Sequence, residues 1–314
     1  MVRFQAEVVR HLTPELYRVL LGVEMGMRNH EYVPIELVCT LALVRGGGCY
    51  KLLSELIKHK LVSYVNKANV QGYRLTFSGY DSLALYSLSS KSVVRAIGAQ
   101  IGCGKESNVF MCQCENDQES SFIVKIHCLG RTCFKTLKKN RDYLKKRHTS
   151  SWIYMSRLSA YREFTYLKAL YSAGFRVPKP IDWNRSAVVM EYVEGVMLCD
   201  IRAEVLDDEQ AQKLADSLIE IGLKLAENGL IHGDLNEFNV ICVERDGDWE
   251  GVMIDFPQMV SVSHPDADMY YERDMNGICE FFRKRFKIEV EYPRLGEIER
   301  TARGLDWELK LSGY

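Results

Sequence analysis

Residues 231–239 read IHGDLNEFN and residues 253–258 read MIDFPQ, so two acidic side chains flank an amide at short intervals. In chain order they are Asp234, Asn239 and Asp255. A phosphoryl transition state spreads negative charge over several oxygens, and metal ions held by carboxylate and amide oxygens neutralise that charge. The two segments therefore predict phosphoryl transfer from a nucleotide, with Asp234 orienting the nucleophile and with Asn239 and Asp255 holding metal.

Each segment alone also has a simpler interpretation. HGD could cap a helix and IDF could end a buried strand, since Asp and Asn are common at both kinds of boundary. The ordered pair is more specific than either part. His232 is expected to brace the loop rather than to transfer a proton. A kinase-type site also requires partners upstream, and the sequence supplies candidates for them.

The first candidates are a glycine-rich segment and a strand with one interior charge. Residues 101–110, IGCGKESNVF, place Gly102 and Gly104 where a backbone passes close to phosphates. Residues 121–127, SFIVKIH, form an apolar strand interrupted by Lys125, whose ammonium would be costly to bury unpaired. This pattern predicts a hairpin over phosphates, followed by a strand whose lysine meets them.

A helix and a further strand complete the pattern. Residues 159–175 predict a helix that offers Glu163 as counter-ion of Lys125, the alternative being a solvated Glu163. The apolar positions of this helix are Ala160, Phe164, Leu167 and Tyr171.

Residues 186–195, SAVVMEYVEG, read as a strand that runs into a linker. Met190 is expected behind an adenine ring, with the backbone of Glu191 and Val193 at the edge of that ring.

From residue 101 to residue 285 the chain resembles the RIO-type atypical protein kinases. The segments GKES, LGRTCF, VPKPIDWNRSAVVMEY, HGDLNEFN and IDFPQMVSVSHPDAD match that family's patterns. The resemblance implies a compact bilobal kinase-like domain that binds ATP with Mg²⁺ or Mn²⁺. Further contacts to the nucleotide are expected from Lys105, Ser107 and Asn108, although Asn108 stands where one subfamily often has Asp.

Residues 1–90 contain no kinase motif and predict a separate domain. A first helix opens at Thr13-Pro14 and a second at Pro34. A turn at residues 46–48, GGG, is expected before a third helix. The apolar face of that helix is expected to comprise Leu52, Leu53, Leu56 and Ile57.

Two alternating runs, LVSYVN and GYRLTF, predict a β-hairpin whose polar loop includes Lys67, Asn69 and Gly72. Three helices and a hairpin predict a winged helix-turn-helix domain. Together with RLTFSGYDSLAL, this domain resembles the second RIO subfamily, which implies a role in maturation of the small ribosomal subunit and in pre-rRNA processing. The expected fold is α+β, with domains at 1–90 and 91–314 and kinase lobes at about 91–190 and 194–314.

Basic residues mark two candidate contacts with rRNA in a pre-small-subunit particle, which also holds ribosomal proteins and assembly factors. One is the third helix and the wing, with Lys51, Lys58, His59, Lys60, Lys67 and Arg74. The other is the segment 131–148; between residues 125 and 148 the chain has nine Lys or Arg against the single acid Asp142. The alternatives are a protein-docking surface for the first and a solvated loop for the second.

Composition narrows the classes of protein further. With 41 basic and 42 acidic residues, any nucleic-acid contact must come from local patches. The ten cysteines include no CxxC pair, which favours reduced thiols over a metal site. No apolar run approaches the roughly eighteen residues of a membrane span, and no signal peptide begins the chain. A cytoplasmic protein is expected, with the nucleus as a second compartment.

Only eighteen residues separate Asp255 from Arg273-Asp274, which leaves little room for an activation loop. A broad surface for protein substrates is therefore not expected. The γ-phosphoryl group could pass instead to water or to the Asp255 carboxylate. Two other functions stay open: a nucleotide-gated scaffold that binds RNA or ribosomes with little turnover, and a small-molecule phosphotransferase. The winged helix and GKES speak against the second.

Overall fold

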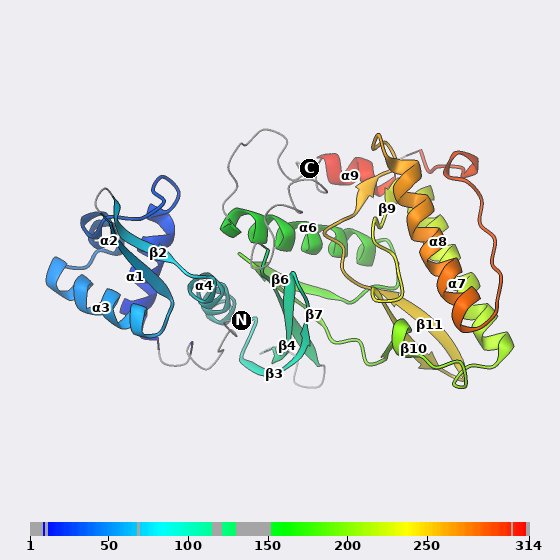
Figure 1. Ribbon diagram of the computed structural model, residues 1–314, viewed down its shortest axis with the longest axis horizontal. Helices are drawn as coiled ribbons and strands as arrows, with labels where there is room; N and C mark the ends of the chain where they lie inside the picture. Colours follow the sequence, from blue (N-terminus) through cyan, green and yellow to red (C-terminus); the bar gives the residue numbers. More distant parts are fainter. Residues whose placement is uncertain are drawn as a thin grey trace. The chain divides into compact units, whose positions relative to one another are not determined.

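The computed structural model describes residues 9, 12–67, 70–114, 121–129, 152–302 and 304–311 (Figure 1). The chain forms two compact units. The first unit comprises Met1–Tyr161 and Ile181–Val189, and the second comprises Arg162–Pro180 and Met190–Tyr314. Each is described by itself.

The first unit begins with three helices and a hairpin. They are α1 (Pro14–Gly26), α2 (Ile35–Ala42), α3 (Gly46–Lys58), β1 (Val62–Lys67) and β2 (Val70–Leu75). The two strands pair antiparallel from Val62↔Leu75 to Lys67↔Val70. Helix α1 starts where the sequence predicts, because the Thr13 side chain accepts a hydrogen bond from Leu16 N and Pro14 needs no donor in the first turn. The expected helices and hairpin are present.

Three details of this region differ from expectation. Gly46, Gly47 and Gly48 form the first turn of α3 rather than a turn before it. The reason is Cys49, which is buried with Leu53 and Leu56 on the same helix face, so packing extends the helix back through the glycines. Ile57 is 37% exposed and lies off that face. Gly72 lies within β2, where an added Cβ would come within 2.8 Å of Val33 O.

The rest of the first unit is a sheet and the helix α4 (Phe77–Ser90). The strands are β3 (Ala96–Cys103), β4 (Ser107–Gln113), β5 (Phe122–His127), β6 (Pro180–Asn184) and β7 (Ala187–Glu191), in the order β3-β4-β5-β7-β6. Tyr80 and Leu83 of α4 join the core of the N-terminal helices, whereas Leu85 and Leu88 join the core of the sheet. Helix α4 is therefore buried on several sides.

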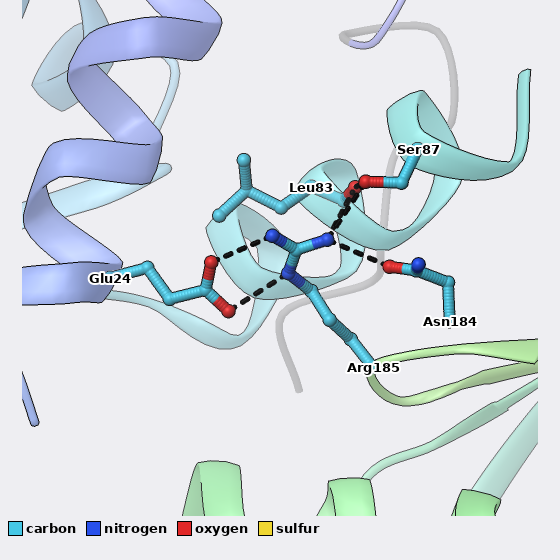
Figure 2. Close-up of polar contacts among 5 residues, drawn as sticks. All are labelled: Glu24, Leu83, Ser87, Asn184 and Arg185. Carbon is cyan, nitrogen blue, oxygen red and sulfur yellow. Dashed lines mark hydrogen bonds and ion pairs between the residues drawn. The ribbon is translucent and has the colours of Figure 1, made fainter. Parts of the chain in front are cut away.

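The turn between β6 and β7 is also tied to this region. Arg185 has a left-handed backbone with φ of 50° and directs its guanidinium at Glu24 of α1 and at Ser87 and Leu83 O of α4 (Figure 2). Beside it, Ser186 donates a hydrogen bond to the buried Asp81 carboxylate of α4. These polar contacts join the turn to α1 and α4.

The second unit contains the long helices α7 (Asp208–Glu227) and α8 (Ala267–Arg285), which pack on each other. Its sheets are small, with strand orders β11-β10-β8 and β12-β9. The strands are β8 (Val196–Met197), β9 (Leu230–Ile231), β10 (Val240–Arg245), β11 (Asp248–Met253) and β12 (Val260–Ser261); short helices are η2 (Leu198–Asp200), η3 (Leu295–Glu297) and α9 (Leu305–Leu311). A capping box of Asp207 and Gln210 starts α7.

Helix α6 (Trp152–Ser172) contributes to both units. Of its expected apolar stripe, Ala160 and Leu167 are buried and Phe164 is half-buried, but Tyr171 is 44% exposed because it lies in the last turn of the helix. In the described part of the chain no single helix is long and apolar enough to cross a membrane; α2 and α3 satisfy that criterion only as a pair bent by 101°.

Candidate active site

The pairing of β10 with β11 brings Asn239 close to Asp255. Val240 at the start of β10 pairs with Met253 at the end of β11. The next residues stay in contact, because Ile254 N donates a hydrogen bond to Asn239 O at 3.0 Å. A hairpin therefore brings the metal-binding candidates Asn239 and Asp255 to adjacent positions, although sixteen residues separate them in the chain.

The Asp234 carboxylate accepts hydrogen bonds from three amide side chains. Gln258 Nε2 lies 3.0 Å from Oδ2, Asn239 Nδ2 lies 3.3 Å from Oδ2, and Asn236 Nδ2 lies 3.3 Å from Oδ1. Asn239 Nδ2 also donates to the backbone oxygen of Asp234 at 2.8 Å. Because Asn239 uses its amide nitrogen for these contacts, its carbonyl oxygen is the atom suited to a metal.

Asp255 has a left-handed backbone with φ of 70°, which is uncommon for a residue other than glycine. Backbone strain of this kind persists where the surrounding structure fixes it, often at functional sites. Among the described residues no three His, Cys, Asp or Glu side chains cluster as a self-contained metal site. One carboxylate and one amide oxygen nevertheless fit Mg²⁺, which usually completes its shell with water and substrate phosphates.

His232 is buried within the same loop. Its Nε2 lies 3.2 Å from Ile254 O, and its ring centroid lies 5.6 Å from that of Phe256. Both contacts join the HGD segment to the IDF segment, as expected for a bracing residue.

Two residues of α8 hold the backbone of the HGD segment, and sequence reasoning missed their role. The Asp274 carboxylate accepts hydrogen bonds from Gly233 N at 2.6 Å and from Leu235 N at 3.0 Å. Arg273 donates to Gly233 O. Burial raises the pKa of Asp274 to about 7, and the two backbone N–H groups oppose that rise. Helix α8 thus holds both N–H groups and a carbonyl group of the loop that carries Asp234.

The predicted phosphate-binding residues of the first unit lie on the β3–β4 hairpin. Gly102 pairs with Val109 beside a register shift in β3, and Gly104 N donates to Ser107 O to close the turn. Lys105 is exposed in this turn. Asn108 is buried; its Oδ1 accepts a hydrogen bond from Gln100, and its Nδ2 donates to the Cys128 sulfur.

Lys125 lies on β5 opposite Val109 and is only 8% exposed. Glu163, on α6 in the part that belongs to the second unit, is 1% exposed, so the solvated alternative for this glutamate is wrong. Met190 is buried near the end of β7. The N–H group of Glu191 donates to Lys179 O at 2.9 Å.

The two candidate RNA-binding regions are described only in part. The segment 131–148, Asn69 and the side chain of Lys67 lie outside the described residues. Lys51, Lys58 and Lys60 are exposed, whereas His59 is half-buried. Arg74 forms a 3.2 Å ion pair with Glu31.

Comparison with known proteins places both parts of the chain. The RIO domain family matches residues 108–295, and the family described as Rio2, N-terminal, matches residues 9–91. The serine/threonine-protein kinase rio2 of Schizosaccharomyces pombe is 45% identical over 317 residues, which cover all of this chain and 89% of that protein. The RIO2 kinase of Caenorhabditis elegans is 46% identical, and the match covers all of this chain but 58% of that protein.

A solved structure is similar throughout. It is the Rio2 kinase of Chaetomium thermophilum in an ADP/Mg²⁺-phosphoaspartate complex, with a TM-score of 0.86 and 39% identity. The match covers 99% of this chain and 94% of that one.

Proposed function

Because this chain belongs to the RIO domain family and carries the Rio2 N-terminal domain, we propose that it is an atypical serine/threonine protein kinase or ATPase acting on Mg-ATP. The observation that carries the proposal is the β10–β11 pairing, which brings Asn239 and Asp255 beside the loop of Asp234. The relatives in Schizosaccharomyces pombe and Caenorhabditis elegans are named serine/threonine-protein kinases, which supports the same activity here.

Each residue then has a distinct task. Asp234 orients the nucleophile, and Asn239 and Asp255 supply oxygens to the metal. Lys125 offers its ammonium to the nucleotide phosphates. Bound Mg²⁺ would neutralise charge that develops on the phosphoryl oxygens. Arg273 and Asp274 keep the backbone of the HGD segment fixed, so that Asp234 does not have to be reoriented during the reaction.

For the acceptor of the phosphoryl group, we propose Asp255 as a second acceptor beside water or a protein hydroxyl. The Chaetomium thermophilum relative was solved as a phosphoaspartate complex, which supports an aspartyl phosphate in this family. An acyl phosphate on Asp255 would be labile to hydroxylamine, and this lability is the property to measure after incubation with ATP.

We further propose that this activity serves maturation of the small ribosomal subunit in the cytoplasm. Support comes from the winged helix, whose exposed Lys51, Lys58 and Lys60 can meet phosphates, and from the basic sequence at 131–148. The partner would be an immature small-subunit particle with its rRNA and proteins.

The test is ATP hydrolysis by the purified chain with Mg²⁺, alone and with immature small-subunit particles. Wild type is compared with Asp234→Ala in both settings. Turnover that depends on Asp234 and responds to the particles is the expected result. Tight ATP binding without such turnover in either setting would contradict the enzyme and favour a nucleotide-gated scaffold.

A further inference from the structure

Gln258 is not among the site residues predicted from the sequence, but its side chain contacts Asp234. It lies three residues after Asp255, and its Nε2 donates to Asp234 Oδ2 at 3.0 Å. The other side-chain donors to this carboxylate, Asn236 and Asn239, lie 3.3 Å away. Since hydrogen bonds weaken with distance and N–H···O bonds have their usual length near 2.9–3.0 Å, the Gln258 contact is the best placed of these three amide contacts to the carboxylate.

The backbone around Gln258 is fixed independently of its amide. Gly233 has a φ of 78°, and a Cβ at Gly233 would come within 2.6 Å of Gln258 O. On the following residue, Met259 O accepts a hydrogen bond from Arg162 at 3.0 Å. One residue later, Val260 pairs with Ile231 at the start of the HGD loop. The side chain of Gln258 is therefore presented to Asp234 by a segment that stays in place without the amide contact.

From these contacts we propose that Gln258 is a positioning residue, which holds the Asp234 carboxylate in the orientation that the nucleophile requires. The proposal rests on the role of Asp234 in the proposed function. A carboxylate turns readily about its last side-chain bond. Together with the longer contacts from Asn236 and Asn239, the Gln258 donor at Oδ2 restrains that rotation and so holds the direction of Oδ1. Gln258 acts through Asp234 and does not touch the reacting groups itself.

The position of Gln258 also connects the two halves of the site. Asp255 and Gln258 belong to one short segment, which is joined to the HGD loop by Ile254 N and by the β9–β12 pairing. The same segment therefore carries Asp255 and the Gln258 amide that contacts Asp234.

The test is steady-state ATP turnover of Gln258→Met, which keeps the length of the half-buried side chain and removes its N–H groups. The matched control is Gln212→Met, because Gln212 Nε2 donates to the Asp216 carboxylate at 2.9 Å on the exposed face of α7. We expect Gln258→Met to lower kcat by roughly 10- to 100-fold with KM for ATP within about twofold of wild type, since misplacement of a reacting group mainly slows the chemical step. The control should match wild type in both constants.

Two further variants separate positioning from a structural role. Gln258→His returns an N–H donor at a similar reach and should recover much of kcat. In an Asp234→Asn background, Gln258→Met should change kcat by less than about twofold, because the group being positioned is already lost. An unchanged kcat in Gln258→Met overturns the proposal. So does an equal loss in both backgrounds, or a loss accompanied by a fall in thermal midpoint that the control does not share.

The same variants distinguish a failure of the proposed function from a failure of the role of Gln258. If Asp234→Asn turns over ATP at the wild-type rate, the proposed function itself fails. If Asp234→Asn is impaired and Gln258→Met is not, only the role of Gln258 fails.

Discussion

Arg185 and Glu24 are separated by 161 residues in the chain and form an ion pair with two hydrogen bonds. The distances are 2.8 Å from Nε to Oε1 and 2.7 Å from Nη2 to Oε2. The two side chains are only 16% and 18% exposed. The remaining nitrogen of the guanidinium, Nη1, bonds Ser87 and Asn184, so every donor nitrogen of this arginine has a partner (Figure 2).

This ion pair predicts a large stability cost when Arg185 is removed. In Arg185→Met the aliphatic stem still packs, but Glu24 keeps a largely buried charge without its partner. We expect the free energy of unfolding to fall by roughly 2–4 kcal/mol. The control is Arg74→Met, which breaks an ion pair to the 72% exposed Glu31 and should cost below about 1 kcal/mol. Urea unfolding followed by fluorescence measures both, and equal costs would contradict the prediction.

The buried carboxylate of Asp274 predicts a pH dependence of stability. Burial raises its pKa from 3.8 to about 7, while Gly233 N, Leu235 N and Arg273 lower it and Asp234 raises it. Between about pH 4 and pH 7 the folded state therefore binds more protons than the unfolded state, and stability falls as pH rises through this window. The thermal midpoint of wild type should fall more steeply from pH 4 to pH 7 than that of Asp274→Asn.

Turnover should respond to Asp274 in the opposite direction. The ionised carboxylate offers two acceptor oxygens, one to each N–H group of the HGD segment, and protonation converts one of them to a hydroxyl. We expect kcat of wild type to rise as pH passes 7 while the thermal midpoint falls. Asp274→Asn should have a lower kcat without this rise. Parallel pH profiles of kcat in the two proteins would exclude the assignment.

Asp255 predicts how nucleotide affinity depends on metal. With Mg²⁺, wild type should bind ATP more tightly than with EDTA, by about 10- to 100-fold, because the carboxylate and the phosphates share the ion. In Asp255→Asn the affinity with Mg²⁺ should approach the EDTA value. Calorimetric titration measures both, with Asp234→Asn as the control that keeps the metal effect. A metal effect of wild-type size in Asp255→Asn would rule out this ligand.

Much of this architecture follows from local signals, and the family and fold class expected from the sequence are confirmed by the RIO domain and Rio2 N-terminal matches. Thr13-Pro14 marks a helix start by its own chemistry. Gly46 was misassigned because packing of Cys49 outweighs the turn preference of glycine. Asp274 was missed because its bonds to the HGD loop span 41 and 39 residues, and no local pattern records them. The boundaries at residues 90 and 91 stay a prediction.

Comparing Gly233 with Gly247 separates the effect of a positive φ from the effect of the close approach to Gln258. Gly233 and Gly247 both have positive φ, 78° and 87°. An added Cβ would lie 2.6 Å from Gln258 O at Gly233, but it meets nothing within 4 Å at Gly247. Each substitution by Ala therefore carries backbone strain of about 1–2 kcal/mol, and only Gly233→Ala also displaces the segment of Gln258.

We expect Gly247→Ala to lower the free energy of unfolding by that strain alone and to keep wild-type kcat. Gly233→Ala should be destabilised by a further 1 kcal/mol or more, by roughly the cost of an overpacked contact. Its kcat should fall by at least about 10-fold, because the displaced backbone carries the Asp234 donor away. The free energy of unfolding and kcat are measured on both variants. Similar kcat values would mean that the close approach of Gly233 and Gln258 has no part in orienting Asp234.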